Sequence, residues 1–140
     1  MGTRSYIGVE LPSGSIVAIY CHWDGYPEGV GDKLIHCYND RAKVLELLRL
    51  GHISSLGVDI ETTEAYHRDR GEEFHPARIM TLEEMSESWA EYCYKFTLED
   101  QWEVKGLGSS KPWCCVEAAI DSEGILWDEV EDEEDKEDDA

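Results

Sequence analysis

Two stretches near the N-terminus alternate between apolar and polar positions with the period of a β-strand. Residues 4–11, RSYIGVEL, place their aliphatic side chains on one face, and residues 15–23, SIVAIYCHW, are rich in β-branched side chains. The Pro-Ser-Gly segment at 12–14 between them has the composition of a tight turn. The two stretches therefore predict a β-hairpin.

Two later segments carry apolar residues at the spacing of an α-helix. Residues 29–38, GVGDKLIHCY, predict a short helix, and residues 41–50, RAKVLELLRL, predict a second one with a broad apolar face. Asp40 stands where it can cap the second helix, and Gly51 has the conformational freedom that suits a helix end. Both helices should turn their apolar faces inward.

The second half of the chain predicts one more helix and further strands. Residues 52–78 are polar and charged with little periodicity, which favours loops. Thr81 and Glu84 have the spacing of a capping box and open a helix. Residues 91–106, EYCYKFTLEDQWEVKG, predict a second hairpin, and residues 112–120, PWCCVEAAI, a last strand. We therefore expect an α+β fold in which an antiparallel sheet, built from two hairpins, packs with two or three short helices.

The charge divides the chain into a domain and a tail. The formal net charge is −20 over 140 residues. Residues 128–140 hold ten acidic side chains against one lysine, which is too much charge and too little apolar surface for folding. We expect residues 1–127 to form a single α+β domain and residues 128–140 to be a disordered acidic tail.

An acidic chain of this kind excludes several classes of partner. Its field repels DNA, RNA and anionic membranes and attracts basic protein surfaces, so direct nucleic-acid binding is not expected. No apolar run approaches the roughly 20 residues of a membrane span, and the N-terminus lacks the apolar core of a signal peptide. The five cysteines show no C-x-x-C spacing, which suits a reducing compartment. These features predict a cytoplasmic protein without membrane contact.

Residues 20–33, YCHWDGYPEGVGDK, hold the densest chemistry in the sequence. A strand, a glycine-rich turn and a helix start can together bind an anion on backbone N–H groups, with Lys33 adding charge. However, Asp32 precedes Lys33, and no Ser or Thr follows it as in a nucleotide-binding loop of the Walker type. The favoured interpretation is a structural turn, in which Trp23 fills a core edge and Asp24 bonds turn amides.

Catalytic and metal-binding interpretations are less favoured. Cys21 and His22 are neighbours on a predicted strand, so their side chains diverge and do not form an activated thiol pair. Asp59 and Glu61 share a strand face and can hold a divalent ion with His67, but acidic loops of this kind are usually just solvated. We expect a non-enzymatic protein with no cofactor and no metal.

A ligand pocket is the alternative. Besides the stretch at 20–33 it draws on residues 67–73, HRDRGEE, whose two arginines can clamp a phosphate. Ion pairing of these arginines with neighbouring carboxylates is the favoured interpretation. The alternative pocket, for a nucleotide, a second messenger or a metal-dependent reaction, would be formed by His22, Asp24, Lys33, Arg68 and Arg70.

These motifs also resemble those of a protein family. The order Y-C-H-W-D-G-Y, a short helix, a D-R-x-K-V helix, an I-S-S-L-G turn and an R-D-R-G-E segment is similar to that of small proteins of bacteriophages and prophages. The similarity covers roughly residues 3–73, with His67 in place of a frequent glycine and the long acidic end as departures. The resemblance implies a phage setting and brings no catalytic residues.

A phage setting offers an explanation for the charge. Host restriction enzymes, CRISPR effectors, polymerases and repair nucleases expose basic grooves that bind phosphates, and an array of carboxylates competes for such grooves. We therefore predict a non-enzymatic inhibitor in the host cytoplasm, of the anti-CRISPR or anti-restriction type, that binds a host or defence-system protein by DNA mimicry. The carboxylates expected to contact this partner are Asp59, Glu61, Glu64, Glu72, Glu73, Glu83, Glu84 and Glu87.

Overall fold

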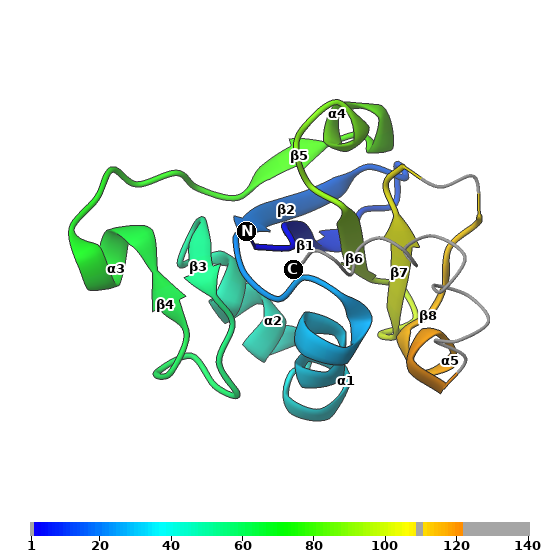
Figure 1. Cartoon of the computed structure of the whole chain (residues 1–140), viewed down its shortest axis with the longest axis horizontal. Coiled ribbons are helices and arrows are strands. Elements are labelled where there is room, and N and C mark those ends of the chain that lie inside the picture. Colours follow the sequence, from blue (N-terminus) through cyan, green and yellow to red (C-terminus); the bar gives the residue numbers. More distant parts are fainter. Residues whose placement is uncertain (1, 109–110, 122–140) are drawn as a thin grey trace.

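The computed structural model describes residues 2–108 and 111–121, which are built around one mixed β-sheet (Figure 1). The strands run in the order β4-β3-β2-β1-β6-β7-β8, and β5 pairs with β2 outside this path. The strands are β1 (Ser5–Glu10), β2 (Ile16–Cys21), β3 (Ile53–Ser55), β4 (Glu64–Ala65), β5 (Arg78–Met80), β6 (Tyr92–Phe96), β7 (Trp102–Gly106) and β8 (Cys114–Cys115). The helices are the π-helical turn η1 (Pro27–Gly31), α1 (Asp32–Cys37), α2 (Arg41–Leu48), α3 (Tyr66–Arg70), α4 (Leu82–Ser86) and α5 (Val116–Asp121).

Both predicted hairpins are present. β1 and β2 pair antiparallel with Tyr6 opposite Tyr20, and Gly14 adopts a φ of 95° in the turn between them. β6 and β7 also pair antiparallel, with Tyr94 opposite Val104. Packing specifies these registers, because a slip by one residue would exchange the side chains of the two faces, which pack into two different clusters.

The expectation of an antiparallel sheet holds only within the hairpins. β1 lies parallel to β6, and β2 is parallel to β3 where Cys21 meets Ile53. Parallel neighbours need a long crossover connection, and the segment between β2 and β6, which carries α1 to α4, supplies it for the β1–β6 pair. Because the alternation within a strand is the same for either kind of neighbour, the sequence pattern did not reveal the mixed sheet.

The strand predicted at residues 112–120 is mostly a helix. Only Cys114 and Cys115 form β8, and α5 begins directly after them. Val116 and Ala119 are buried, and their i, i+3 spacing places them on one face of α5, which contacts η1 and α1. A short apolar run fits a buried strand or a helix equally well, so the expectation of a strand was wrong.

The three predicted helices are confirmed, with small differences. Thr81 and Glu84 form the predicted capping box, in which each side chain accepts the N–H of the other residue. Asp40 occupies the N-cap position of α2, but its side chain makes no capping hydrogen bond. Residues 52–78, expected to be loops, also contain β3, β4 and α3.

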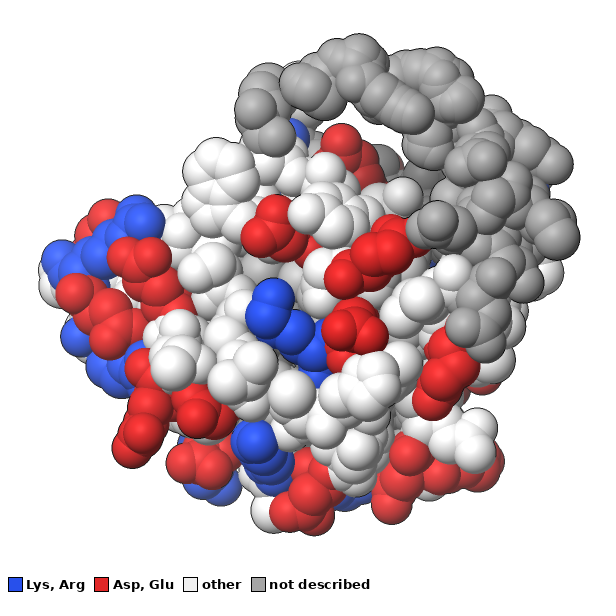
Figure 2. Space-filling view, turned by 60° about the horizontal axis from the view of Figure 1, so that its bottom comes forward, with Lys and Arg blue, Asp and Glu red and all other residues white. Residues whose placement is uncertain are grey.

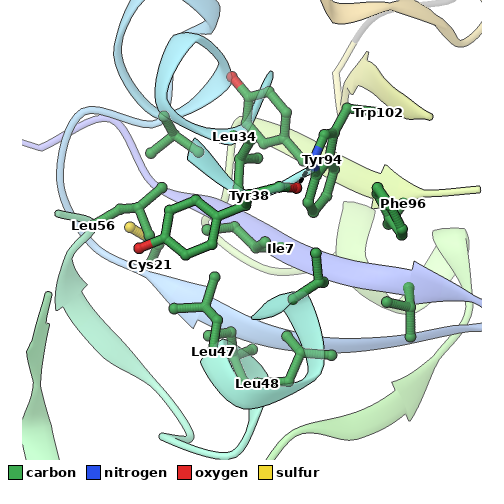
Figure 3. Close-up of a cluster of buried hydrophobic side chains, with 14 of the residues drawn as sticks. Ile7, Cys21, Leu34, Tyr38, Leu47, Leu48, Leu56, Tyr94, Phe96 and Trp102 are labelled. Carbon is green, nitrogen blue, oxygen red and sulfur yellow. Dashed lines mark hydrogen bonds between the residues drawn. The ribbon is translucent and has the colours of Figure 1, made fainter. Parts of the chain in front are cut away.

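Buried side chains lie on both faces of the sheet. One face is covered by α1, α2 and α5, and there the indole N–H of Trp102 donates to the Tyr38 carbonyl at 2.9 Å. The other face holds a smaller cluster around Met80 and Met85, from β5 and α4. Trp23, expected to fill a core edge, is instead 42 % exposed. Figure 3 shows part of the larger cluster, including Ile7, Cys21, Leu34, Leu47, Leu48, Leu56, Tyr94 and Phe96.

No helix within the described ranges is long and apolar enough to cross a membrane. The acidic tail expected at 128–140, and the end of the expected domain at 127, lie outside the described residues.

Candidate functional site

Two tyrosines and a histidine gather on one face of the first hairpin. Tyr20 and His22 are two residues apart along β2 and its extension, so their side chains point to the same face. The ring of Tyr6, from β1, meets Tyr20 edge to face with centroids 6.0 Å apart. The Tyr20 hydroxyl lies 2.8 Å from Nδ1 of His22, and the His22 ring packs against Trp23 with centroids 4.7 Å apart.

His52 fills a gap in the sheet beside Tyr20. β5 pairs with one part of the outer edge of β2, and β3 pairs with the end of that strand. Between them the N–H of Tyr20 donates to Nδ1 of His52 at 3.2 Å, and the His52 ring stacks on His75 with centroids 5.5 Å apart. Burial first, then the charges of His75 and Arg78, lower the pKa of His52 to about 4. The ring is therefore neutral at pH 7 and accepts the hydrogen bond.

An open pocket lies beside this cluster. Its volume is about 480 Å³, and it is lined by Arg4, Tyr6, Tyr20, Ser88 and Trp89; we call it the Tyr20 pocket. Trp89 follows α4 in the chain and is 84 % exposed. The volume falls within the range of roughly 300–1,000 Å³ that small-molecule sites occupy. The pocket therefore combines aromatic walls with a guanidinium group.

The backbone of Arg4 is anchored by Glu91, and its side chain hydrogen-bonds to Tyr20. Its N–H donates to the Glu91 carboxylate at 2.8 Å, and its carbonyl accepts the N–H of Glu91 at 2.8 Å. Arg41, Arg68 and Arg70 each form an ion pair with a carboxylate. Within the described residues, the Arg4 guanidinium forms no such pair, and Arg4 is one of the residues that line the pocket.

Positive charge surrounds His22. Burial first, then the charges of Arg4 and Arg70, lower the pKa of His22, so the ring is neutral at pH 7. Burial raises the pKa of Tyr20, although Arg4 acts in the opposite direction. A protonated Tyr20 therefore donates its hydroxyl proton to Nδ1 of a neutral His22. Two guanidinium groups therefore act on His22, although Arg70 is itself paired with Glu64 and Glu72.

The glycine-rich turn is held by hydrogen bonds within the turn and to Thr3 and Tyr94. The N–H groups of Gly25, Gly29 and Val30 donate to backbone carbonyls at 2.8, 2.9 and 2.8 Å. The buried Tyr94 hydroxyl donates to the Gly25 carbonyl, and Asp24 adopts a left-handed φ of 59°. Because these amides are used within the fold, they do not present an anion site.

Arg68 and Arg70 bind carboxylates of their own segment. Arg68 contacts Asp69 at 2.9 Å, while Arg70 contacts Glu64 at 2.9 Å and Glu72 at 3.8 Å. The hydrogen bond from its neighbour Arg68 lowers the pKa of Asp69, and the hydrogen bond to Glu64 raises the pKa of Arg70. The two arginines therefore stabilise the local β4–α3 structure rather than forming an open phosphate clamp.

The five residues considered for a ligand pocket do not all come together. His22 and Arg70 are close enough for the charge of Arg70 to act on the His22 ring. Asp24 is directed elsewhere, since its carboxylate accepts the Tyr26 hydroxyl at 3.1 Å instead of the turn amides expected from the sequence. Lys33 lies on α1, which covers the opposite face of the sheet from the Tyr20 pocket.

The eight carboxylates predicted to contact a basic partner form two separate groups. Residues 59–73 lie around β4 and α3, whereas residues 83–87 lie on or just after α4, at another edge of the molecule (Figure 1). Figure 2 shows Lys and Arg mixed with Asp and Glu at the left end, where α3 lies, and acidic side chains in several separate groups elsewhere on that face. The carboxylates are therefore not one continuous array.

Five of the eight carboxylates already have partners. Asp59 accepts from Thr62, Glu64 and Glu72 pair with Arg70, Glu73 lies 3.9 Å from His75, and Glu84 completes the capping box. Within the described part of the chain, the side chains of Glu61, Glu83 and Glu87 have no hydrogen bond or ion pair, so these three remain available for a partner.

Among the described residues, the side chains considered for a metal site and for a Cys21–His22 thiol pair do not come together for these roles. The described residues contain no group of three or more His, Cys, Asp or Glu side chains that could hold a metal ion. Asp59 is engaged by Thr62, and Nδ1 of His67 lies 2.9 Å from the Glu72 carbonyl. Burial raises the pKa of the Cys21 thiol to about 12, so it is not a thiolate at pH 7.

Comparison with known proteins adds no assignment: the chain matches no family model, no curated protein and no solved structure. Functional inference therefore rests on the residues themselves.

The sequence interpretation predicted none of the five residues that line the Tyr20 pocket. It named only His22, which contacts the lining residue Tyr20. A signal was present for part of it, because a hairpin with its turn at 12–14 places Tyr6 opposite Tyr20. No local signal brings Trp89 to this hairpin, since it arrives there through the crossover segment.

Proposed function

We propose that this chain is a phage-encoded, non-enzymatic inhibitor that binds the basic surface of a host defence or nucleic-acid-processing protein. The observation that carries the proposal is the excess of negative charge on the described part of the chain. Residues 2–108 and 111–121 contain 21 acidic and 11 basic side chains, which gives a net charge of −10. Such a field accelerates encounter with a basic groove and disfavours nucleic acid as a direct partner.

The surface around α4 supports this function best. The capping box fixes the start of the helix, and Glu83 and Glu87 extend from it without partners among the described residues. Ile79, on the strand that leads into α4, is 62 % exposed and supplies apolar contact area. Charged and apolar groups on an ordered element are the combination that protein–protein interfaces use.

The test begins with capture of a host partner by the full chain, followed by titration of that partner at two salt concentrations. Affinity should fall steeply with added salt, because exposed ion pairs are screened over a Debye length of about 8 Å at physiological ionic strength. The double variant Glu83→Lys, Glu87→Lys should weaken binding by about tenfold or more, as expected when several charge pairs are inverted.

A charge-matched control separates a local contact from a general effect of net charge. Glu46 on α2 and Glu99 in the β6–β7 turn are exposed and lie on other elements. The variant Glu46→Lys, Glu99→Lys has the same net charge as the α4 variant and should bind nearly as well as the parent. Binding that is unchanged by added salt and by the charge reversal on α4 would refute the proposal that acidic side chains bind a basic partner surface.

A further inference from the structure

The Tyr20 pocket has aromatic walls that suit a flat ring. Its cavity of about 480 Å³ is open to solvent, and Tyr6, Tyr20 and Trp89 are among its lining residues. Trp89 is 84 % exposed, so most of its ring is accessible for stacking on a ligand. Aromatic walls of this kind stack on planar rings and tolerate many ring types.

The same pocket contains a cation suited to a phosphate. Arg4 lines the cavity, its backbone is anchored by Glu91, and no described carboxylate pairs with its guanidinium. A guanidinium binds phosphate through two parallel N–H donors, with more geometric specificity than an ammonium group. Ser88, also in the lining, carries a hydroxyl, which at present donates to the Met85 carbonyl at 2.7 Å and whose oxygen accepts the N–H of Ala90. Arg4 is therefore the cationic side chain in the lining of the pocket.

The groups next to the pocket favour an anion as well. The charge of Arg70 reaches His22, and the Tyr20 hydroxyl joins His22 to the wall of the pocket. His22 itself is neutral at pH 7, and its ring can donate from Nε2 when Nδ1 accepts from Tyr20. Arg70 is itself paired with Glu64 and Glu72, so Arg4 is the guanidinium at this pocket that has no carboxylate ion pair among the described residues, and the neutral His22 adds a hydrogen-bond donor.

We infer that the Tyr20 pocket binds a small ligand that joins a planar aromatic ring to a single phosphate group, the chemistry of a nucleoside monophosphate, with the ring against Trp89 and the phosphate on Arg4. This site goes beyond the proposed inhibition of a host protein and does not depend on it.

The charge of the rest of the chain limits the size of the ligand. A polynucleotide lying in the pocket would extend over a surface that carries a net charge of −10 in its described part, and phosphate repulsion would oppose binding. A monophosphate occupies only the surface next to Arg4, and more distant carboxylates are screened beyond a Debye length of about 8 Å. The pocket therefore selects a mononucleotide over a strand.

The experiment is a calorimetric titration of the full chain with AMP, GMP, CMP and UMP. Adenosine provides the ring without the phosphate, and ribose 5-phosphate provides the phosphate without the ring. At least one monophosphate should bind at micromolar to low millimolar concentration, and each partial probe should bind about tenfold more weakly, because each loses one of the two anchors. Binding should quench the fluorescence of an exposed tryptophan.

Matched variants locate the ligand. Arg4→Gln keeps the backbone hydrogen bonds to Glu91, and Trp89→Ala removes a ring that is not part of the core, so both should remain folded. Each should weaken monophosphate binding by about tenfold, whereas Trp89→Phe keeps an aromatic face and should bind within about threefold of the parent. Arg49→Gln on the surface after α2, and Leu98→Ala in the β6–β7 turn, should change nothing.

Three outcomes would overturn the inference. The first is the absence of any heat or fluorescence change with all four monophosphates at millimolar concentration. The second is binding that survives both Arg4→Gln and Trp89→Ala, which would move the ligand to another site. The third is tighter binding of a twelve-nucleotide single strand than of any monophosphate, which would make the site a strand-binding surface. Failure of host-protein capture, by contrast, would leave this site unaffected.

Discussion

The hydroxyl of Tyr20 lies 2.8 Å from Nδ1 of His22, two residues further along the same face of the sheet. The surroundings determine the direction of this hydrogen bond. Burial raises the pKa of Tyr20, while burial together with Arg4 and Arg70 lowers the pKa of His22, so the tyrosine is the donor at neutral pH. In the segment 20–33, which the sequence predicts to be a turn, this hydrogen bond therefore lies at the end of the strand that precedes the turn.

The protein should lose stability as the pH falls from about 6.5 toward 4, partly through His52. Its pKa is about 4 in the folded state against an ordinary value of 6.5, so the unfolded chain binds the proton first. The contribution of the neutral His52 ring to the free energy of unfolding is complete above pH 6.5 and is lost as the pH falls from 6.5 to about 4. Urea unfolding at pH 7 and pH 5 measures it.

The control for this prediction is His52→Asn, which keeps an acceptor for the Tyr20 N–H but does not titrate. The loss of stability between pH 7 and pH 5 should be smaller in the variant than in the parent. Equal losses in the two proteins would show that His52 is not responsible.

Two tryptophans should differ sharply in their contribution to stability. Trp102→Ala should destabilise the fold by about 3–5 kcal/mol, because the ring is only 3 % exposed and its N–H is bonded to the Tyr38 carbonyl. Trp23→Ala should cost about 1 kcal/mol, since Trp23 is 42 % exposed. Chemical denaturation of both variants measures the difference. If Trp23→Ala lowered the free energy of unfolding more than Trp102→Ala, the packing of Trp23 in the turn would matter more for stability than the buried ring of Trp102.

Tyr94→Phe should destabilise the fold by about 1–3 kcal/mol, because it removes the buried donor to the Gly25 carbonyl and leaves that carbonyl unsatisfied. The matched control is Tyr26→Phe, which removes an exposed hydroxyl bonded to Asp24 and should cost less than about 0.5 kcal/mol. Thermal melting compares them. If both variants had the melting temperature of the parent, the hydrogen bond between Tyr94 and Gly25 would not contribute to stability.

Thr81→Ala should cost about 1 kcal/mol, the usual loss for an N-cap side chain. Glu84→Lys should also destabilise, because the Glu84 carboxylate accepts the N–H of Thr81. Glu83→Lys, one position earlier, should leave the melting temperature nearly unchanged. A cost for Glu83→Lys equal to that for Glu84→Lys would attribute the effect to charge alone, and Glu83 would then be unsuitable for the binding test.

The candidate site was predictable only in part. The alternation along residues 4–11 and 15–23 is enough to place Tyr6, Tyr20 and His22 on one face, because side chains two apart on a strand share a face. Arg4 is a candidate binding residue because no described carboxylate pairs with its guanidinium. Trp89 is one because the fold places it in the pocket beside the hairpin. Both facts depend on contacts between residues that are distant in the sequence, and a local pattern does not predict such contacts.

The sequence by itself determined the local elements: two hairpins, the three helices and the capping box at Thr81. These follow from short-range patterns of burial, turn composition and capping. Only the tertiary structure decided that β1 lies parallel to β6 and that the apolar run after Cys115 is a helix. It also decided that His52 completes the edge of β2. Each of these depends on which surfaces meet, and the free energy of such contacts is set by partners that a local pattern does not specify.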